Sequence, residues 1–290
     1  MLYEKITERI PIERGWSGDA KFKVTIDGSC YLLRISSPEK RKRVEGIHQR
    51  MCSAAALNVP MCRPIECGIC SEGVYAIQSW IDGSDLSALL PHMPKDQQYA
   101  YGLDAGRILK QFHSIPAPEG VADWEERFNK KVDRKIAMYE NCPLKYAHGE
   151  RFLAYLAENR HLLSGRPQSW QHGDYHIGNM MLDKSGVLTI IDFDRDDFGD
   201  PWEEFNRIVW CAQAAPVFAR GMVDGYFDKD VPDAFWKLLA FYICSNTLGS
   251  LPWAVPFGDG EVQIMCRQAK DILQWYNGMQ QIIPSWYQTD

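Results

Sequence analysis

The segment QHGDYHIGNM, residues 171–180, contains two histidines, an aspartate and an asparagine, interspersed with glycines. Such a cluster can hold a metal ion, transfer a proton or simply turn the chain, because short polar residues beside glycine are typical of turns. A second segment, VLTIIDFD at residues 187–194, reads as a short apolar strand with Asp192 at its end. The order and spacing of the two segments are more specific than either segment alone.

The polar residues of these segments have an informative spacing. His172, Asp174 and Asn179 follow the pattern H-x-D-x-x-x-x-N, which is typical of a kinase catalytic loop. A carboxylate such as that of Asp174 can orient an incoming hydroxyl group and accept its proton. Mg²⁺ prefers hard oxygen ligands, which Asn179 and Asp192 can supply. A lone histidine is more often a packed core residue, so we expect His172 to support the loop rather than to transfer a proton.

The first part of the chain reads as a small sheet with one helix. Residues 21–36, KFKVTIDGSCYLLRIS, contain two apolar runs around an Asp-Gly step, which is the usual sign of a β-hairpin. Upstream, Gly15, Ser17 and Gly18 lie in a loop that can let backbone N–H groups approach phosphates, or can be a plain turn. A helix is expected over residues 39–57, and residues 61–81 read as two further strands.

Beyond an Asp-Gly-Ser break at residues 82–84 the pattern becomes helical. In YAYGLDAGRILKQFHSI, residues 99–115, apolar and small residues recur at three- and four-residue intervals. Helices are expected to about residue 163 and again over residues 202–290, with short strands and turns between them. The chain is therefore expected to be α+β, with a small sheet followed by a larger helical part.

The composition excludes several classes of protein. The 290 residues are 46% hydrophobic and 24% charged, which is typical of a globular chain with a substantial core. The charged N-terminus cannot be a signal peptide, and no run of about 18 apolar residues occurs, so a soluble cytoplasmic protein without a membrane contact is expected. The nine cysteines are expected to be reduced thiols. The basic run at residues 40–43 reads as a solvated helix start, and nothing else indicates a nucleic-acid partner.

The chain resembles the aminoglycoside phosphotransferase and choline kinase-like family, which is related to the protein kinases. The resemblance covers nearly the whole chain and rests on HGDYHIGN at 172–179 and IDFD at 191–194, with less specific pieces such as YLLRI at 31–35 and FGDPWEEFNRI at 198–208. It implies a two-lobed, protein-kinase-like fold. Residues 1–82 would form an N-terminal nucleotide-binding lobe of antiparallel strands, and residues 83–290 a larger, mostly helical lobe for catalysis and substrate binding.

The resemblance also implies roles for individual residues. Asp174 would be the catalytic base, and Asn179 and Asp192 would bind Mg²⁺. The phosphoryl donor would be ATP or GTP. Three groups of residues would contact the nucleotide. The phosphate loop contains Gly15, Ser17 and Gly18, and the basic strand residue Arg34 has Glu45 as its acidic partner. The hinge would meet the adenine through its backbone and consists of Gln78, Ser79, Trp80 and Ile81.

Two positions depart from the pattern of the family. Arg34 stands where the family often has lysine, and a planar, forked guanidinium is not equivalent to an ammonium group in reaching phosphates. Glu45 is expected to pair with Arg34, although a solvated helix face would explain this glutamate as well. The sequence DFD replaces D-F-G, so Asp194 could contact the metal or face solvent.

For the acceptor, the resemblance implies a small molecule with a hydroxyl group, in the first place a cationic, aminoglycoside-like antibiotic. A metabolic kinase of an amino alcohol or a sugar is an alternative, as is a nucleotide-binding module with weak catalysis. A protein kinase is disfavoured, because no A-P-E-like segment follows residue 194. Several acidic residues of the helical part could contact a polycation or could simply form a solvated surface: Asp224, Asp228, Asp259 and Glu261.

Overall fold

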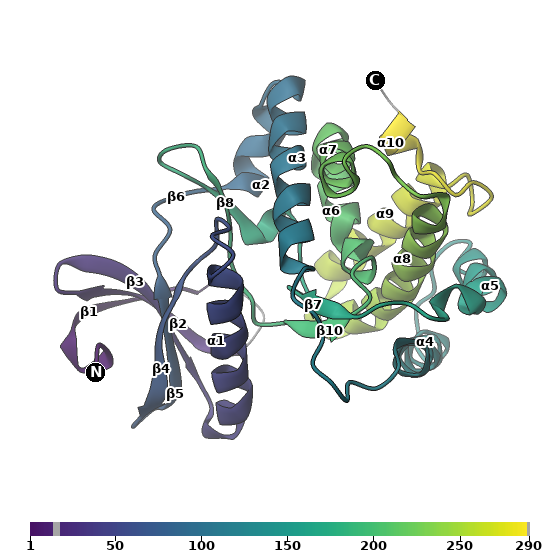
Figure 1. Ribbon diagram of the computed structural model, residues 1–290. Helices are drawn as coiled ribbons and strands as arrows, with labels where there is room; N and C mark the ends of the chain where they lie inside the picture. Colours follow the sequence, from purple (N-terminus) through teal and green to yellow (C-terminus); the bar gives the residue numbers. More distant parts are fainter. Residues whose placement is uncertain (14–17, 289–290) are drawn as a thin grey trace. The chain divides into compact units, whose positions relative to one another are not determined.

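The computed structural model describes residues 1–13 and 18–288, which form two compact units (Figure 1). The first unit consists of Met1–Leu86 and Gly178–Asp196, and the second of Ser87–Ile177 and Asp197–Asp290. The chain first passes from one unit to the other between Leu86 and Ser87. The segment Gly178–Asp196 belongs to the first unit, although it lies within the range 83–290 that is expected to form the helical lobe.

The first unit is built on a five-stranded antiparallel sheet in the order β1-β2-β3-β5-β4. Its strands are β1 Ile6–Pro11, β2 Ala20–Ile26, β3 Ser29–Ser36, β4 Pro64–Cys70 and β5 Gly73–Ser79. The core side chains recur at every second position, as expected for one face of a pleated sheet. They are Val24, Ile26, Leu33, Ile35, Tyr75 and Ile77.

The hairpin of β2 and β3 confirms the strand pair predicted around the Asp-Gly step. Asp27 and Gly28 have φ values of 48° and 80°, so both central residues are left-handed, as in the tight turn that suits twisted strands. The strand β1 is not predicted from the sequence. Five of its six residues are exposed, because it is an edge strand, and it therefore has no alternation of apolar and polar residues to recognise.

The helix α1 Arg41–Ala55 packs against β4 and β5 and is preceded by the short 3₁₀ turn η2 Pro38–Lys40. It buries Ile47, Met51 and Ala54, which lie on one helical face. The chain leaves the helix through Asn58, whose φ is 57°. The helix predicted over residues 39–57 is thus confirmed, and asparagine tolerates this left-handed turn better than most residues.

A second, three-stranded sheet completes the first unit in the order β6-β8-β9. Its strands are β6 Gly83–Asp85, β8 Met180–Asp183 and β9 Leu188–Ile190. Leu182 of β8 pairs with both Ser84 of β6 and Leu188 of β9, so this sheet joins segments that are distant in the sequence.

The second unit is mostly helical, which confirms the predicted α+β class with an antiparallel N-terminal sheet. Its longer helices are α3 Lys95–Phe112, α4 Trp124–Glu140, α5 Glu150–Asn159, α6 Ile208–Ala214, α7 Pro216–Phe227, α8 Asp233–Ala254 and α9 Asp259–Trp275. Short elements complete it: α2 Leu86–Leu89 at the junction with the first unit, α10 Ser285–Gln288, and the antiparallel pair β7 Ser169–Gln171 and β10 Asp197–Gly199.

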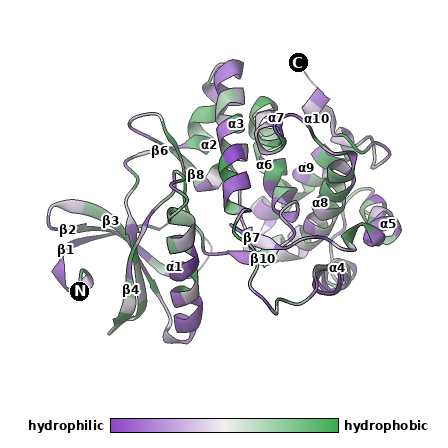
Figure 2. Ribbon diagram, in the orientation of Figure 1, coloured by the Kyte–Doolittle hydropathy of each residue, from purple (hydrophilic) through white to green (hydrophobic). Residues whose placement is uncertain are grey.

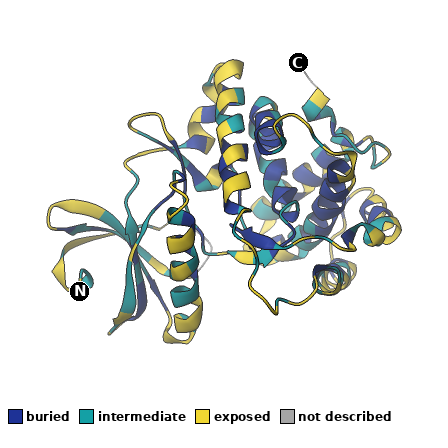
Figure 3. Ribbon diagram, viewed as in Figure 1, coloured by how far each residue is buried: buried dark blue, intermediate teal, exposed yellow. Residues whose placement is uncertain are grey.

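The helix α8 lies at the centre of this unit and is apolar and buried along most of its length (Figures 2 and 3). Within the described residues, the stretch Asp233–Phe257 is the one helix long and apolar enough to cross a membrane by length and composition. Its apolar window is 67% buried inside the protein, which is the character of a core helix.

The helices α3 and α7 approach each other through glycines. A Cβ atom at Gly106 would lie 2.1 Å from the carbonyl oxygen of Met222, and one at Gly225 would lie 2.2 Å from that of Leu103. Side chains at these positions would force the two helix backbones apart. This close contact fixes α3, whose residue Ala105 accepts a hydrogen bond from the buried hydroxyl of Tyr175 at 2.7 Å.

Candidate active site

The loop that follows β7 in the second unit is held by a buried glutamate. The backbone N–H groups of His172 and Gly173 donate to the two carboxylate oxygens of Glu204, at 2.7 Å and 2.6 Å. Glu204 comes from the 3₁₀ turn η6 Glu203–Arg207 and is 2% exposed. Hydrogen bonds to a buried carboxylate are stronger than neutral ones, so this glutamate fixes the backbone just before Asp174.

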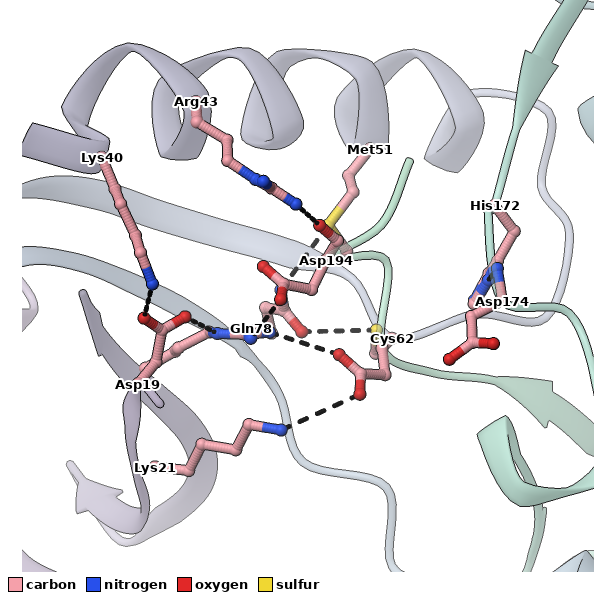
Figure 4. A network of polar contacts seen from close by, with 12 residues as sticks. Asp19, Lys21, Lys40, Arg43, Met51, Cys62, Gln78, His172, Asp174 and Asp194 are labelled. Carbon is pink, nitrogen blue, oxygen red and sulfur yellow. Dashed lines mark hydrogen bonds and ion pairs between the residues drawn. The ribbon is translucent and has the colours of Figure 1, made fainter. Parts of the chain in front are cut away.

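His172 supports the same loop, as expected from the sequence. It is fully buried, its Nδ1 accepts the backbone N–H of Asp174 at 3.3 Å, and its ring meets the edge of Tyr175 (Figure 4). Gly173 between them has a φ of 81°, which a residue with a Cβ rarely adopts. The glycine in this motif therefore serves the turn that presents Asp174.

The carboxylate of Asp174 is partly exposed and lies between two basic side chains. The Nε of Arg207 is 3.2 Å from its Oδ1, and the Nε2 of His176 is 3.6 Å from the same oxygen. A guanidinium beside a carboxylate fixes the orientation of that carboxylate. The carboxylate of Asp174 is thus held in place at the end of the loop.

Asn179 and Asp192 belong to the first unit, where one hairpin brings them together. Met180 of β8 pairs with Ile190 of β9, and the carbonyl oxygen of Asn179 accepts the N–H of Ile191 at 3.0 Å. Asp192 follows directly with a φ of 65°, a conformation that non-glycine residues seldom adopt. Such backbone strain is found preferentially at functional sites.

The donor atoms of this hairpin fit Mg²⁺. Over residues 1–13 and 18–288, no group of three or more His, Cys, Asp or Glu side chains is arranged to hold a metal ion. Mg²⁺ often takes only one or two protein carboxylates and completes its octahedron with phosphate and water oxygens. An amide oxygen from Asn179 and a carboxylate from Asp192 match such a site, in which a nucleotide supplies further ligands.

Arg34 of β3 is the centre of an ion-pair network in the first unit. Its Nε is 2.8 Å from Asp19, its Nη1 is 3.2 Å from Asp192, and its Nη2 is 2.7 Å from Asp194. These acidic neighbours raise the pKa of Arg34 against the opposing effect of burial. Lys21 lies 3.8 Å from the other oxygen of Asp192. The arginine thus holds the expected metal ligand together with Asp194, which does not simply face solvent.

The expected pairing of Arg34 with Glu45 is wrong. Glu45 pairs instead with Arg41, 2.8 Å away on the outer face of α1. The face of α1 that lines a pocket with Arg34 carries Val44 and His48, and successive helical residues point about 100° apart. Glu45 is therefore out of phase with the arginine.

Asp19 takes the place of the expected glutamate, although nothing in its local sequence indicates this. Its carboxylate is 3% exposed and also accepts Lys40 at 2.7 Å (Figure 4). Burial alone would raise the pKa of Asp19, but the hydrogen bonds from Lys40 and Arg34 outweigh it and lower the pKa. Lysine and arginine together neutralise this buried charge.

The remaining predicted nucleotide contacts are distributed over the first unit. Gly15 and Ser17 lie outside the described residues, and Gly18 has a φ of 68° with open space where a Cβ would lie. Gln78 and Ser79 end β5, where Ser79 donates its N–H to the carbonyl of Arg63 at 2.9 Å. Trp80 and Ile81 follow the strand, and the ammonium of Lys23 lies 5.0 Å from the Trp80 ring.

The acidic residues considered for a cationic acceptor do not form one surface. Asp224 is 4% exposed and accepts hydrogen bonds from the hydroxyls of Tyr99 and Tyr287, each at 2.7 Å. It is therefore an internal residue. Asp228 is exposed and pairs with Lys110, while Asp259 and Glu261 lie in the first turn of α9.

We expect the substitution Arg34→Lys to raise the KM for the nucleotide roughly tenfold, because a single ammonium group cannot bridge three carboxylates as the fork does. Steady-state kinetics with varied nucleotide measures this effect. The matched control is Arg41→Lys, which changes an exposed arginine of the same unit. An unchanged KM in Arg34→Lys would show that the site needs only a positive charge.

Comparison with known proteins gives one family and one fold. The profile of the family described as "Phosphotransferase enzyme family" matches residues 8–235. No curated protein sequence matches the chain significantly.

Two of the similar solved structures are of aminoglycoside phosphotransferases, and a third is of a protein described as a putative aminoglycoside phosphotransferase. A thermostable mutant of APH(4)-Ia in a ternary complex with ADP and hygromycin B has a TM-score of 0.65 at 17% identity, covering 93% of this chain and 94% of that one. The complex of gentamicin with APH(2″)-IIa has a TM-score of 0.62 at 17% identity, covering 95% and 94%. The protein from Ralstonia eutropha JMP134 has a TM-score of 0.63 at 14% identity, covering 93% of each chain. These likenesses show the kinase-like fold.

Proposed function

Because this chain belongs to the phosphotransferase enzyme family and acts on hydroxyl groups, we propose that it transfers the γ-phosphoryl group of ATP or GTP to a small acceptor. The observation that carries the proposal is the loop at Asp174, whose backbone is fixed by the buried Glu204 and whose carboxylate is oriented by Arg207. A rigidly held carboxylate in an H-x-D-x-x-x-x-N motif suits the base of a phosphoryl transfer. The cytoplasm, where these nucleotides are supplied, is its expected location.

In this mechanism the acceptor oxygen attacks the γ-phosphorus, and the bond to the oxygen that bridges the β- and γ-phosphorus atoms breaks. The hydroxyl proton passes to the carboxylate of Asp174, and the nucleoside diphosphate leaves. Arg207 and the loop backbone keep the carboxylate in one orientation, which reduces the entropy lost on reaching the transition state. Asp174 contributes by positioning the hydroxyl and by accepting its proton.

Asn179 and Asp192 would hold Mg²⁺ with the nucleotide. When bound, this ion neutralises the charge that develops on the phosphate oxygens. Arg34 pairs with Asp192 at 3.2 Å. When the nucleotide binds, part of this guanidinium would turn to the phosphates, which carry more negative charge than one carboxylate. Donor chemistry of this kind is supported by the ADP found in the similar complex.

The substitution Asp192→Ala is expected to weaken Mg²⁺-dependent nucleotide binding by roughly tenfold or more, because the site loses its one charged metal ligand. Calorimetric titration of the nucleotide with and without Mg²⁺ measures this difference. Glu45→Ala, on the outer face of α1 in the same unit, is the matched control. Equal nucleotide affinity in Asp192→Ala and the unchanged protein would remove Asp192 from the metal site.

The identity of the acceptor is determined by experiment. The similar structures bind hygromycin B and gentamicin, which makes aminoglycosides one class to test, with amino alcohols and sugars as metabolic alternatives. The test is a coupled nucleotide-turnover assay with Mg²⁺ and either ATP or GTP over these acceptors. Acceptor-dependent turnover supports a kinase. Nucleotide that binds without turnover over the whole panel would favour a binding module with weak catalysis.

A further inference from the structure

Three basic side chains of the second unit lie near one another, and we call them the basic cluster: Lys131 and Lys135 of α4 and Arg207 of η6. Lys131 and Lys135 are one helical turn apart, and the charges of Lys131 and Arg207 both act on Lys135. Arg207 contacts Asp174 directly at 3.2 Å. Lys131 lies 3.1 Å from Glu203, whose other carboxylate oxygen accepts a hydrogen bond from Gln171 at 3.3 Å. Two carboxylates thus face three cations, and one of these carboxylates is the proposed base.

Lys135 is the cation of the basic cluster that pairs with neither carboxylate. In the part of the chain that the structure describes, no hydrogen-bond or ion-pair partner lies at its ammonium group, although its side chain is partly buried. Burial, followed by repulsion from Lys131, lowers the pKa of Lys135 to about 7, in spite of the attraction of Glu203. The lowered pKa therefore reflects poor solvation first and the neighbouring positive charges second.

The position of Lys135 is shaped by the helix beside it. The helices α4 and α8 pack side by side (Figure 1), and a Cβ atom at Gly249 of α8 would lie 3.2 Å from the Cγ, Cδ and Cε atoms of Lys135. Glycine at this position therefore makes room for the lysine stem. Gly249 belongs to a set of α8 residues at helical spacing that are not buried, together with Asn246, Ser250 and Trp253.

We propose that the basic cluster binds an anionic group, such as a carboxylate or a phosphate, on the same acceptor molecule whose hydroxyl group is phosphorylated. The inference rests on the proposed kinase function and adds the class of acceptor. An anion would give Lys135 the partner that it lacks, and Arg207 links this place to Asp174. A polycationic acceptor would instead meet Lys135, whose charge no carboxylate pairs, and this like charge disfavours an aminoglycoside at the basic cluster.

The first test asks whether anions reach Lys135, independently of catalysis. The protein is acetylated briefly with acetic anhydride near neutral pH, and the extent of labelling at each lysine is measured by peptide mass spectrometry. Sodium gluconate or sodium sulfate is compared with sodium chloride at equal ionic strength, and with glucose. Lys130 is the internal control, because it lies on the same helix, pairs with Glu126 and is 74% exposed.

The inference predicts that gluconate or sulfate slows the acetylation of Lys135 several-fold and leaves that of Lys130 unchanged. Glucose and sodium chloride should have no effect on either lysine. Equal acetylation of Lys135 in all of these solutions would overturn the inference, whatever the enzyme phosphorylates.

The second test compares Lys135→Met with Lys130→Met in the turnover assay, over hydroxylated acceptors with and without an acidic group. Methionine keeps the aliphatic stem and removes a cation that is poorly solvated, so the melting temperature of Lys135→Met should be no lower than that of the unchanged protein. The acceptor KM should rise roughly tenfold in Lys135→Met and stay constant in Lys130→Met, because one charged contact is lost.

The two proposals can fail separately in this assay. Efficient turnover of an aminoglycoside with a KM unaffected by Lys135→Met would overturn the anionic acceptor and keep the kinase. Protection of Lys135 by anions without turnover of any acceptor would keep the anion site and count against the kinase function.

Discussion

The substitution Asp174→Ala is expected to lower acceptor-dependent turnover about a thousandfold while nucleotide affinity stays nearly constant. General-base catalysis and the positioning of a hydroxyl group contribute about 10²–10⁴-fold. Asp174 belongs to the second unit, whereas Asn179, Asp192 and Arg34 belong to the first, so the nucleotide ligands remain in place. Turnover of the acceptor and calorimetric nucleotide affinity, measured on the same preparation, check the two halves of this prediction.

Asp174→Asn is the companion variant. Its amide oxygen can still accept a hydrogen bond from Arg207, which lies 3.2 Å from the carboxylate, but the amide cannot take up a proton. Both variants should therefore be inactive, and the asparagine variant should retain the loop structure. If either variant turns over within a few-fold of the unchanged enzyme, Asp174 is not the base.

The second large effect is expected for the stability of the second unit. Asp200 is fully buried and accepts Arg166 through two hydrogen bonds, at 2.7 Å and 2.9 Å. It also accepts the hydroxyl of Tyr242 at 2.6 Å and the N–H of Trp202 at 3.0 Å. Asp200→Ala leaves the guanidinium and the hydroxyl without their partner. Breaking such a buried pair costs about 3–5 kcal/mol.

Urea denaturation followed by circular dichroism measures this loss in the free energy of unfolding. The matched control is Asp104→Ala in α3, which removes an exposed aspartate 3.3 Å from Arg107. An exposed helical pair of this kind contributes about 0.2–0.5 kcal/mol. A loss in Asp200→Ala no larger than that in Asp104→Ala would mean that Arg166 finds another partner.

Short sequence patterns are enough to predict turns and helices, because these elements depend on neighbouring residues. The Asp-Gly turn and the helix over residues 39–57 are confirmed. The partner of Arg34 could not be predicted in this way. Successive residues of a helix point about 100° apart, so the side chain of Glu45 points away from Arg34 and pairs with Arg41. Asp19, which lies outside this helix, pairs with Arg34 instead.

The support of the candidate site was also invisible in the sequence. Glu204 lies 30 residues or more from the loop that it holds, and a buried glutamate has the same letter as a solvated one. In the sequence, Lys135 likewise looks like a solvated residue on the polar side of an amphipathic helix. The structure shows instead that its aliphatic stem packs against Gly249 of a neighbouring helix. Contacts between distant segments decide both cases.

The most direct test of the account is a ³¹P NMR experiment on the enzyme with Mg²⁺, nucleotide triphosphate and the acceptors that show turnover. We predict a new phosphate monoester resonance that grows as the γ-phosphate signal declines, and that is absent with Asp174→Ala. Release of inorganic phosphate alone, or an ester signal of equal rate with Asp174→Ala, would contradict phosphoryl transfer to a hydroxyl group at this site.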